Sequence, residues 1–276
     1  MSIFSRIRKK EAVTEAPAPV QTIEEPAKAE PMPEISLHQR ILNAAGSQEV
    51  ENVKARHAYY HGRTDATGEW DNIWAMNENS SWAHAFGRMR GADQVWFGSV
   101  TSYDKLCFEN WLNIYETYPE VGGKDPRPLM EASVHTLVTD VIEVAADGQS
   151  ARGSFITPGV IHSRLTDEGH PYCHVLWERY GSDFVLENGK WKYLHEHVCP
   201  DLMTNMDNYD WAHGEYARLT DPNPPPPPPT TLGNPPVTDP GPMHLPYSVL
   251  DKPRNTCPYP VPYRTLDNDN SYTPLV

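Results

Sequence analysis

The hydrophobic pattern changes from helical to extended about halfway along the chain. An apolar face with steps of three and four residues predicts a helix over residues 48–62, and it is carried by Val50, Val53, His57 and Tyr60. A shorter helix over residues 36–45, capped by Ser36, is predicted before it. A third is predicted over residues 104–118, because a capping box leads into it and Pro119 ends it.

The following region is rich in β-branched residues and turn signals. Strands are predicted over residues 132–145, 151–157, 174–180, 183–186 and 191–198. Asp147-Gly148 and Asn188-Gly189 favour hairpin turns between them. Pro158-Gly159 is expected to end the second strand, and Gly181 to kink the chain between the third and the fourth. Helices followed by such a meander predict an α+β fold, with helices on one face of a curved antiparallel sheet that encloses a pocket.

The two ends of the chain differ from the part between them. All eight Trp residues lie between Trp70 and Trp211, so we expect one domain over residues 36–220. Residues 1–35 are rich in Glu, Ala and Pro and predict a disordered leader. Residues 221–276 hold more than half of the 28 prolines. Apolar residues follow a polyproline run there, so we expect this extended tail to dock on its own domain or on a partner subunit.

Charge and cysteine usage narrow the function classes. A formal net charge of −14 does not suit a polyanionic partner, so we expect no nucleic acid and no membrane surface as partner. The sequence has no apolar run of about 18 residues and no secretory signal, which predicts a soluble, cytoplasmic protein. Its four cysteines form no C-x-x-C pair and are expected to be reduced thiols.

Three segments together resemble the SnoaL-like group of the NTF2-like superfamily. They are residues 53–60 running into Asp65, residues 135–153 with the Asp147-Gly148 turn, and residues 180–192 with the Asn188-Gly189 turn before Trp191. The resemblance extends over roughly residues 36–215, while the Pro-rich tail and a long insertion at residues 66–130 depart from the compact family pattern. It implies a cone-shaped α+β domain, a small hydrophobic substrate, and assembly as a homodimer or homotrimer.

The same resemblance implies a catalytic site. In dehydratases of this group, a Tyr at a helix end, an Asp after it and a His on a central strand converge without a cofactor or metal. Tyr60, Asp65 and His135 match these places, and His162 corresponds to a second His. His135 would act as the base, because the ordinary pKa of an imidazole, about 6.5, lies near working pH. Asp65 would hold its tautomer, and Tyr60 would donate a hydrogen bond to a developing enolate.

Aromatic residues suit the wall of a pocket for an aromatic or polycyclic hydroxy compound. The candidates for substrate contact are Tyr59, Trp70, Trp74, Trp82, Trp96 and Phe97. Each candidate also has a purely structural explanation, because tyrosines on helical stripes, histidines in strands and tryptophan clusters commonly belong to a core. Metal binding by His57 and His61, or by His195 and His197, is an alternative for which the sequence fixes no third ligand.

Three functional alternatives stay open beside a dehydratase. A C–C lyase that releases formaldehyde from a lignin-type diaryl compound needs the same acid–base groups. An isomerase or cyclase moves a proton in the same pocket without losing a fragment. A non-catalytic binding or assembly module would have its pocket filled by its own side chains.

Overall fold

A computed structural model describes residues 34–62, 66–75, 77–84, 87–96, 133–165, 171–205 and 257–273. Residues 1–33 of the expected leader, the helix at 104–118 and the polyproline run lie outside these residues. The helices are α1 (Leu37–Gly62), α2 (Ala66–Ile73) and α3 (Ala92–Trp96). The strands are β1 (Ser81–His84), β2 (Gly87–Arg90), β3 (Ser133–His135), β4 (Val138–Val144), β5 (Ser150–Leu165), β6 (Pro171–Glu187) and β7 (Lys190–Asn205).

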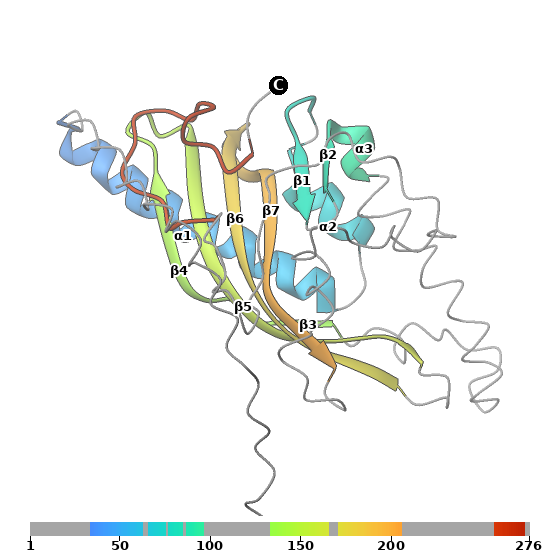
Figure 1. Ribbon diagram of the computed structural model, residues 1–276. Coiled ribbons are helices and arrows are strands. Elements are labelled where there is room, and N and C mark those ends of the chain that lie inside the picture. Colours follow the sequence, from blue (N-terminus) through green and yellow to red (C-terminus); the bar gives the residue numbers. More distant parts are fainter. Residues whose placement is uncertain are drawn as a thin grey trace, which may run out of the picture. The chain divides into compact units, whose positions relative to one another are not determined.

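The strands form one curved sheet in the order β2-β1-β7-β6-β5-β3, with β4 also paired to β5. Figure 1 shows α1 running along one face of this sheet, and α1 packs against β3, β4, β5 and β7. The architecture is α+β, as expected. The expected purely antiparallel sheet is wrong at one place, because β1 pairs with β7 in parallel and makes the sheet mixed.

Helix α1 is one helix where the sequence predicted two. Ser36 caps it as predicted, since its Oγ accepts a hydrogen bond from the Gln39 amide at 3.1 Å. The expected break falls at Gly46, but this residue lies inside the helix, against the Trp191 side chain. A Cβ at position 46 would come within 3.0 Å of the Trp191 ring, so the glycine allows α1 to approach β7 closely.

Strand β5 passes through Pro158 and Gly159, where the sequence predicted its end. Pro158 lies opposite the two residues between β3 and β4, where the partner strand changes. Its carbonyl accepts the Thr136 amide at 3.3 Å and the Thr136 hydroxyl at 2.7 Å. The missing proline N–H is therefore tolerated at a gap between two partner strands.

The two predicted hairpin turns are confirmed. Asn188 and Gly189 have φ angles of 51° and 73°, and Gly148 has a φ of 70°. Both glycines thus occupy the left-handed region that the turn requires.

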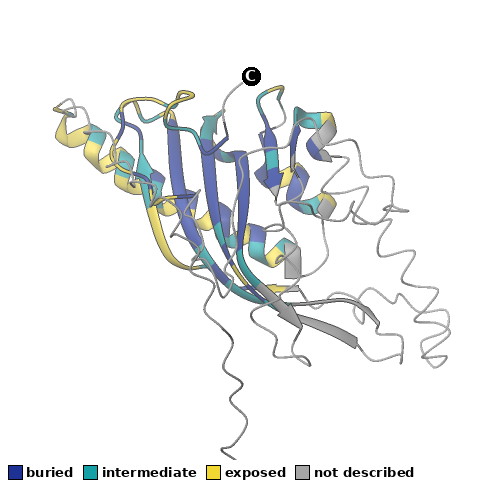
Figure 2. Cartoon of the chain, viewed as in Figure 1, coloured by how far each residue is buried: buried dark blue, intermediate teal, exposed yellow. Residues whose placement is uncertain are grey.

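The two faces of β5, β6 and β7 have different coverings, because side chains alternate along each strand. The face toward α1 carries Phe155, Tyr180, Ser182, Phe184, Tyr193 and Glu196. The opposite face carries Arg152, Ser154, Gly181, Asp183, His195, His197 and Cys199. Residues 257–273, here called the C-terminal strap, cover part of this second face. Figure 2 shows the central stretches of these strands buried, whereas the outer end of α1 is exposed.

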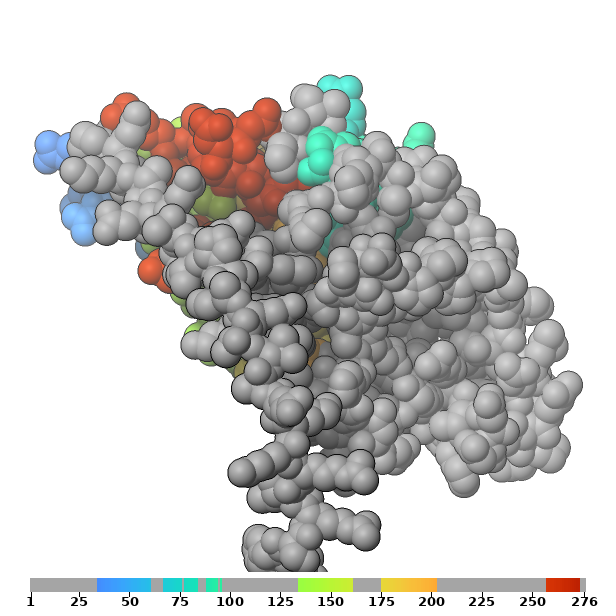
Figure 3. Space-filling model, viewed as in Figure 1, coloured from blue at the N-terminus to red at the C-terminus, as the bar shows by residue number. Residues whose placement is uncertain are grey.

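The C-terminal strap is tied to the sheet along its length. A disulfide joins Cys199 of β7 to Cys257, so the expectation of reduced thiols is wrong for this pair. The Ala146 amide donates to the Tyr263 carbonyl at 3.0 Å, and the Tyr272 amide donates to Asp183 at 3.0 Å. In Figure 3 the strap forms the red surface beside the green strand residues. Among the helices that the structure describes, none has the length and apolar character that crossing a bilayer requires.

A substitution at Gly181 should loosen the strap. A Cβ there would lie 2.5 Å from the Tyr272 ring, so Gly181→Ala forces the ring away and should lower the unfolding free energy by about 1–3 kcal/mol. Urea unfolding of Gly181→Ala, Tyr272→Ala and the double variant measures this. Gly181→Ala should cost much less when Tyr272→Ala has already removed the ring, and an equal cost in both backgrounds would contradict this packing.

The strap should also make the fold sensitive to alkali. Burial raises the pKa values of Tyr263 and Tyr272 above their ordinary value near 10. Since the unfolded chain releases these protons near pH 10 and the folded chain retains them, the unfolding free energy should fall as the pH rises above about 10. Unfolding curves from pH 9 to 11 measure this slope, and it should be shallower in Tyr272→Phe. An unchanged slope would show that Tyr272 already ionises in the folded protein.

Candidate functional site

Three acid–base pairs lie buried on the α1 face of the sheet. They are Lys54 with Glu196, His57 with Glu69, and His135 with Glu178, and each of these side chains is at most 9% exposed. Buried charged groups are rare unless they are paired, so three pairs around two tyrosines form an unusual interior. We refer to these six residues with Tyr180 and Tyr193 as the buried polar cluster.

The His135–Glu178 pair is joined through Tyr180. The Tyr180 hydroxyl lies 3.0 Å from His135 Nδ1 and donates to Glu178 Oε2 at 3.0 Å. Glu178 itself is 3.7 Å from His135 Nδ1. Because the phenol has only one proton, the network assigns Nδ1 as the protonated nitrogen that donates to the Tyr180 oxygen. His135 Nε2 is then the basic nitrogen of this ring.

The Lys54–Glu196 pair places a positive charge beside the same tyrosine. Lys54 Nζ lies 2.5 Å from Glu196 Oε1 and 3.9 Å from the centre of the Tyr180 ring. The Ser182 hydroxyl donates to the other Glu196 oxygen. Burial lowers the pKa of Lys54, and the nearby Glu196 carboxylate opposes this effect. An ammonium over the ring face is held by cation–π attraction.

The His57–Glu69 pair joins α1 to α2. His57 Nδ1 lies 2.8 Å from Glu69 Oε1, which also accepts the Trp74 indole N–H at 3.2 Å. The imidazole faces the edge of the Tyr180 ring, with 6.0 Å between ring centres. Burial and the Glu196 and Glu69 carboxylates raise the pKa of Tyr193 well above its ordinary value. Tyr193 therefore stays a neutral phenol within this cluster.

The structure brings only part of the expected site together. His135 lies in the buried polar cluster, at the end of β3. Tyr60 lies outside it, on a side of α1 that lines a surface groove with Arg56 and Trp191. The α1 side chains that reach the cluster are Lys54 and His57. Asp65 lies outside the described residues, and of His162 only the backbone is described, on β5 opposite Cys173.

The expected aromatic wall is divided in the same way. Trp70 and Trp74 are buried in the hydrophobic core, and Trp74 stacks on Tyr193 with 5.3 Å between ring centres. Trp82 is half-buried against this core, whereas Tyr59 is 71% exposed and points away from it. Trp96 ends α3 and its side chain lies outside the described residues, as does the whole of Phe97. Trp74 directly contacts the cluster through Tyr193 and Glu69.

Sequence reasoning missed the partners that hold His135. Glu178, Tyr180 and Ser182 lie on alternate positions of β6 together with Phe184, which places them all on the face toward α1. Charged and hydroxyl side chains at inward positions of a strand are a signal for a buried polar network. Lys54 and His57 continue the apolar stripe of α1 at steps of three and four residues. Polar side chains at such positions likewise indicate a buried polar network.

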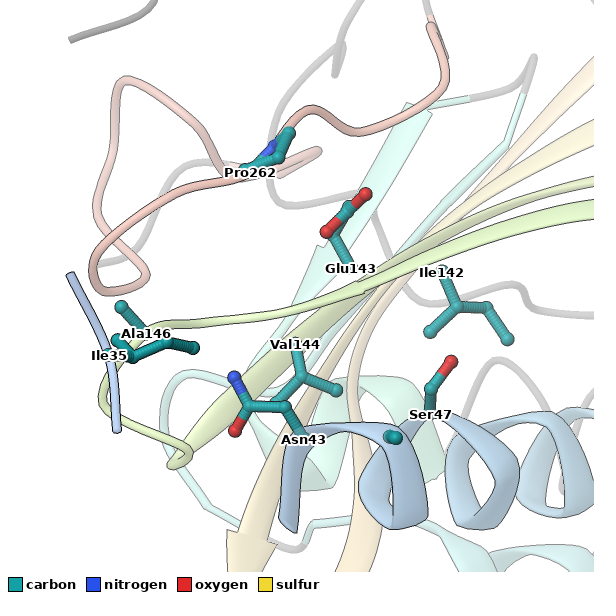
Figure 4. Close-up of a pocket in the computed structure, with 9 residues that line it drawn as sticks. Ile35, Asn43, Ser47, Ile142, Glu143, Val144, Ala146 and Pro262 are labelled. Carbon is teal, nitrogen blue, oxygen red and sulfur yellow. The ribbon is translucent and has the colours of Figure 1, made fainter. Parts of the chain in front are cut away.

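Two surface cavities lie apart from the cluster. The first, of about 290 Å³, lies between α1, β4 and the strap, and Figure 4 shows its lining side chains. Partial burial there raises the pKa of Glu143. The second, of about 530 Å³, is the groove lined by Tyr60, and it also carries Arg56, Lys190 and Lys192. Neither cavity contains a residue of the buried polar cluster.

Potential metal ligands gather on the strap side of the sheet. His197, Cys199 and Cys257 present ligand atoms within 4.8 Å of one another. His195 lies on the same face but is engaged elsewhere, since Nδ1 lies 2.8 Å from Asp183 and Nε2 2.9 Å from the Asn79 carbonyl. His57, the other expected metal ligand that is described, is engaged by Glu69.

Several solved structures are similar to this chain at low sequence identity. A hexachlorocyclohexane dehydrochlorinase, LinA-type3 from Novosphingobium barchaimii, is 12% identical with a TM-score of 0.43, over 63% of this chain and 96% of that one. An NTF2-like superfamily protein from Salmonella enterica is 18% identical with a TM-score of 0.42, over 57% of this chain and 92% of that one. No protein-family model and no curated protein matches the chain. At these identities and TM-scores, the similarities transfer no activity to this chain.

The Lys54–Glu196 pair should behave as one unit. Lys54→Met leaves a buried carboxylate without its cation and should lower the unfolding free energy by about 3–5 kcal/mol. Adding Glu196→Gln removes the uncompensated charge and should recover much of this loss. Urea unfolding of both single variants and the double variant measures the coupling. Additive effects would show that the two charges do not depend on each other.

Proposed function

We propose that this chain is a lyase of the dehydratase type that works by acid–base chemistry, with His135 as its base. The observation that carries this proposal is the buried hydrogen-bonded chain His135–Tyr180–Glu178. Tyr180 orients the imidazole through Nδ1 and is itself held by the Glu178 carboxylate. An imidazole that is held in this way at one nitrogen can act as a base through the other. The interior supplies the acid–base groups, so the proposal requires no cofactor.

The proposed reaction uses a substrate with a carbonyl, an acidic C–H beside it and a hydroxyl on the next carbon. His135 Nε2 takes the C–H proton, and the electron pair moves onto the carbonyl oxygen as an enolate. The enolate then re-forms the carbonyl and expels the hydroxyl, which leaves as water with the proton returned by His135. While the imidazole is charged, Tyr180 and Glu178 stabilise it.

The surroundings of the cluster favour an aromatic or polycyclic substrate. Phe155, Phe184 and Trp74 are buried beside it, and rings prefer to stack on rings. The low dielectric constant of this interior strengthens every charge interaction with a developing enolate. The Lys54 ammonium supplies positive charge in the same layer of side chains. We propose a cytoplasmic location for such an enzyme, which acts on a small metabolite.

A second candidate, a non-catalytic NTF2-like binding or assembly module, has one specific observation in its favour. Trp70 and Trp74 are 2% and 4% exposed and fill space beside the polar cluster. In this alternative the three acid–base pairs serve only the fold. Proton abstraction from a bound carbonyl compound separates the two candidates, because only the lyase requires it.

His135→Gln and Tyr180→Phe should each remove activity. Aromatic β-hydroxy ketones provide the substrate panel, and mass spectrometry detects the lost fragment. Removing the base in His135→Gln should lower kcat/KM by about 10²–10⁴-fold. Removing the phenol hydroxyl in Tyr180→Phe should also lower kcat/KM, because His135 Nδ1 loses the partner that fixes its tautomer. Since it acts through His135, Tyr180→Phe should also shift the pH profile of kcat. His38→Gln and Tyr259→Phe, which change exposed residues, are matched controls.

Deuterium exchange tests the first step without the second. Analogues that lack the leaving hydroxyl should exchange the C–H beside the carbonyl with D₂O solvent in the wild type and in both controls. Exchange should be lost in His135→Gln. Full turnover by a folded His135→Gln protein would refute the assignment of the base. The absence of both turnover and exchange across the panel, in the folded wild-type protein, would favour the non-catalytic module. The mass of the fragment distinguishes water from formaldehyde.

A further inference from the structure

A cluster of soft ligands lies on the strap side of the sheet, away from the proposed catalytic residues. His197 and Cys199 are two residues apart on β7, so both side chains leave the same face of the strand. Cys257 comes to them from the C-terminal strap. All three residues are at most 1% exposed, and one ligand atom from each lies within 4.8 Å of the others.

We propose that, when the Cys199–Cys257 disulfide is reduced, these three residues form a binding site for Zn²⁺. Thiolates and an imidazole are the preferred ligands of this ion, with Zn–S near 2.3 Å and Zn–N near 2.0–2.1 Å. Tetrahedral ligands at those lengths lie roughly 3.3–3.8 Å apart. In the structure the two sulfur atoms are bonded and one ligand atom of each residue lies within 4.8 Å of the others, so the sulfur atoms must move apart after reduction to form the site.

The oxidation state decides which bond holds the strap. In the structure the two sulfur atoms are joined to each other, and in this form they cannot act as thiolate ligands. A dithiol such as dithiothreitol transfers two electrons and two protons to the disulfide and is itself oxidised, which yields two thiols. Binding of Zn²⁺ then displaces the two thiol protons. Disulfide and metal site therefore exclude each other.

Charge favours a divalent ion at this position. Two thiolates and a neutral imidazole carry a charge of −2, which Zn²⁺ neutralises completely. A buried site with no net charge avoids the solvation cost of an unpaired ion. Cu⁺ also prefers thiolates, but it would leave one negative charge in a fully buried place.

The surroundings hold the three ligands together in either state. The Ser154 hydroxyl donates to the Cys257 carbonyl at 3.4 Å, and Cys257 Sγ lies 3.7 Å from the His197 carbonyl. His195, the other imidazole on this face, is held by Asp183 and Asn79. His197 is therefore the imidazole that belongs to the site, and the strap stays attached to β7 whether a disulfide or a metal joins them.

Cobalt titration tests the proposal, since Co²⁺ is a spectroscopic substitute for Zn²⁺. The full-length protein, reduced with dithiothreitol that is then removed under nitrogen, should bind one equivalent and show a thiolate-to-cobalt absorption band. The oxidised protein should show no such band. Cys199→Ser and Cys257→Ser should lose it, and His197→Gln should weaken Co²⁺ binding by roughly tenfold or more. His38→Gln, at an exposed position, should bind as the wild type does.

A second measurement does not depend on how the variants fold. Zn²⁺ should protect Cys199 and Cys257 of the reduced wild type from alkylation, as mapped by mass spectrometry. The double variant Cys107→Ser with Cys173→Ser should keep both the cobalt band and the protection. A reduced wild type that binds no Co²⁺, or equal alkylation with and without Zn²⁺, would overturn the proposal. A cobalt band that survives in folded Cys257→Ser would overturn it as well.

Discussion

The burial of β6 on both faces is the constraint on which the rest of the structure depends. One face carries Glu178, Tyr180 and Ser182 into the layer beneath α1, and the other carries Gly181 and Asp183 beneath the C-terminal strap. Since Glu178, Tyr180, Ser182 and Asp183 are all buried, their polar groups need hydrogen-bond or charge partners. Lys54 of α1, Glu196 of β7 and the Tyr272 amide of the strap supply such partners. The helix, the sheet and the strap are therefore held by the same few residues.

This constraint explains which parts of the fold could be predicted from the sequence. Hairpin turns depend on two adjacent residues, so Asn188-Gly189 and Asp147-Gly148 could be identified from local chemistry alone. Gly46 and Pro158 resemble breaks for the same local reason, yet neither breaks its element. Trp191 packs on Gly46, and Pro158 faces the gap between β3 and β4. These contacts come from residues far away in the chain, which a local pattern does not contain.

The candidate site shows the same limit. His135 could be selected because its position on a strand suited a buried base, and the structure places it in the interior. Its partner Tyr180 is 45 positions away, and the geometry that joins them depends on β3 and β6 lying on either side of β5. Tyr60 followed the apolar stripe of α1, but Lys54 and His57 are the members of that helix that reach the cluster. A stripe identifies one side of a helix, and it does not identify which of its residues face a given strand.

The attachment of the strap to Asp183 sets an order for folding during translation. β5, β6 and β7 are translated before residues 257–273, so the strap cannot cover their outer face during that interval. Asp183 lacks its contacts with Ser271 and Tyr272 during this interval. Helix α1 precedes these strands in the chain and can pack on their inner face once they have formed, whereas the packing of Tyr272 on Gly181 has to wait until residues 257–273 have been translated.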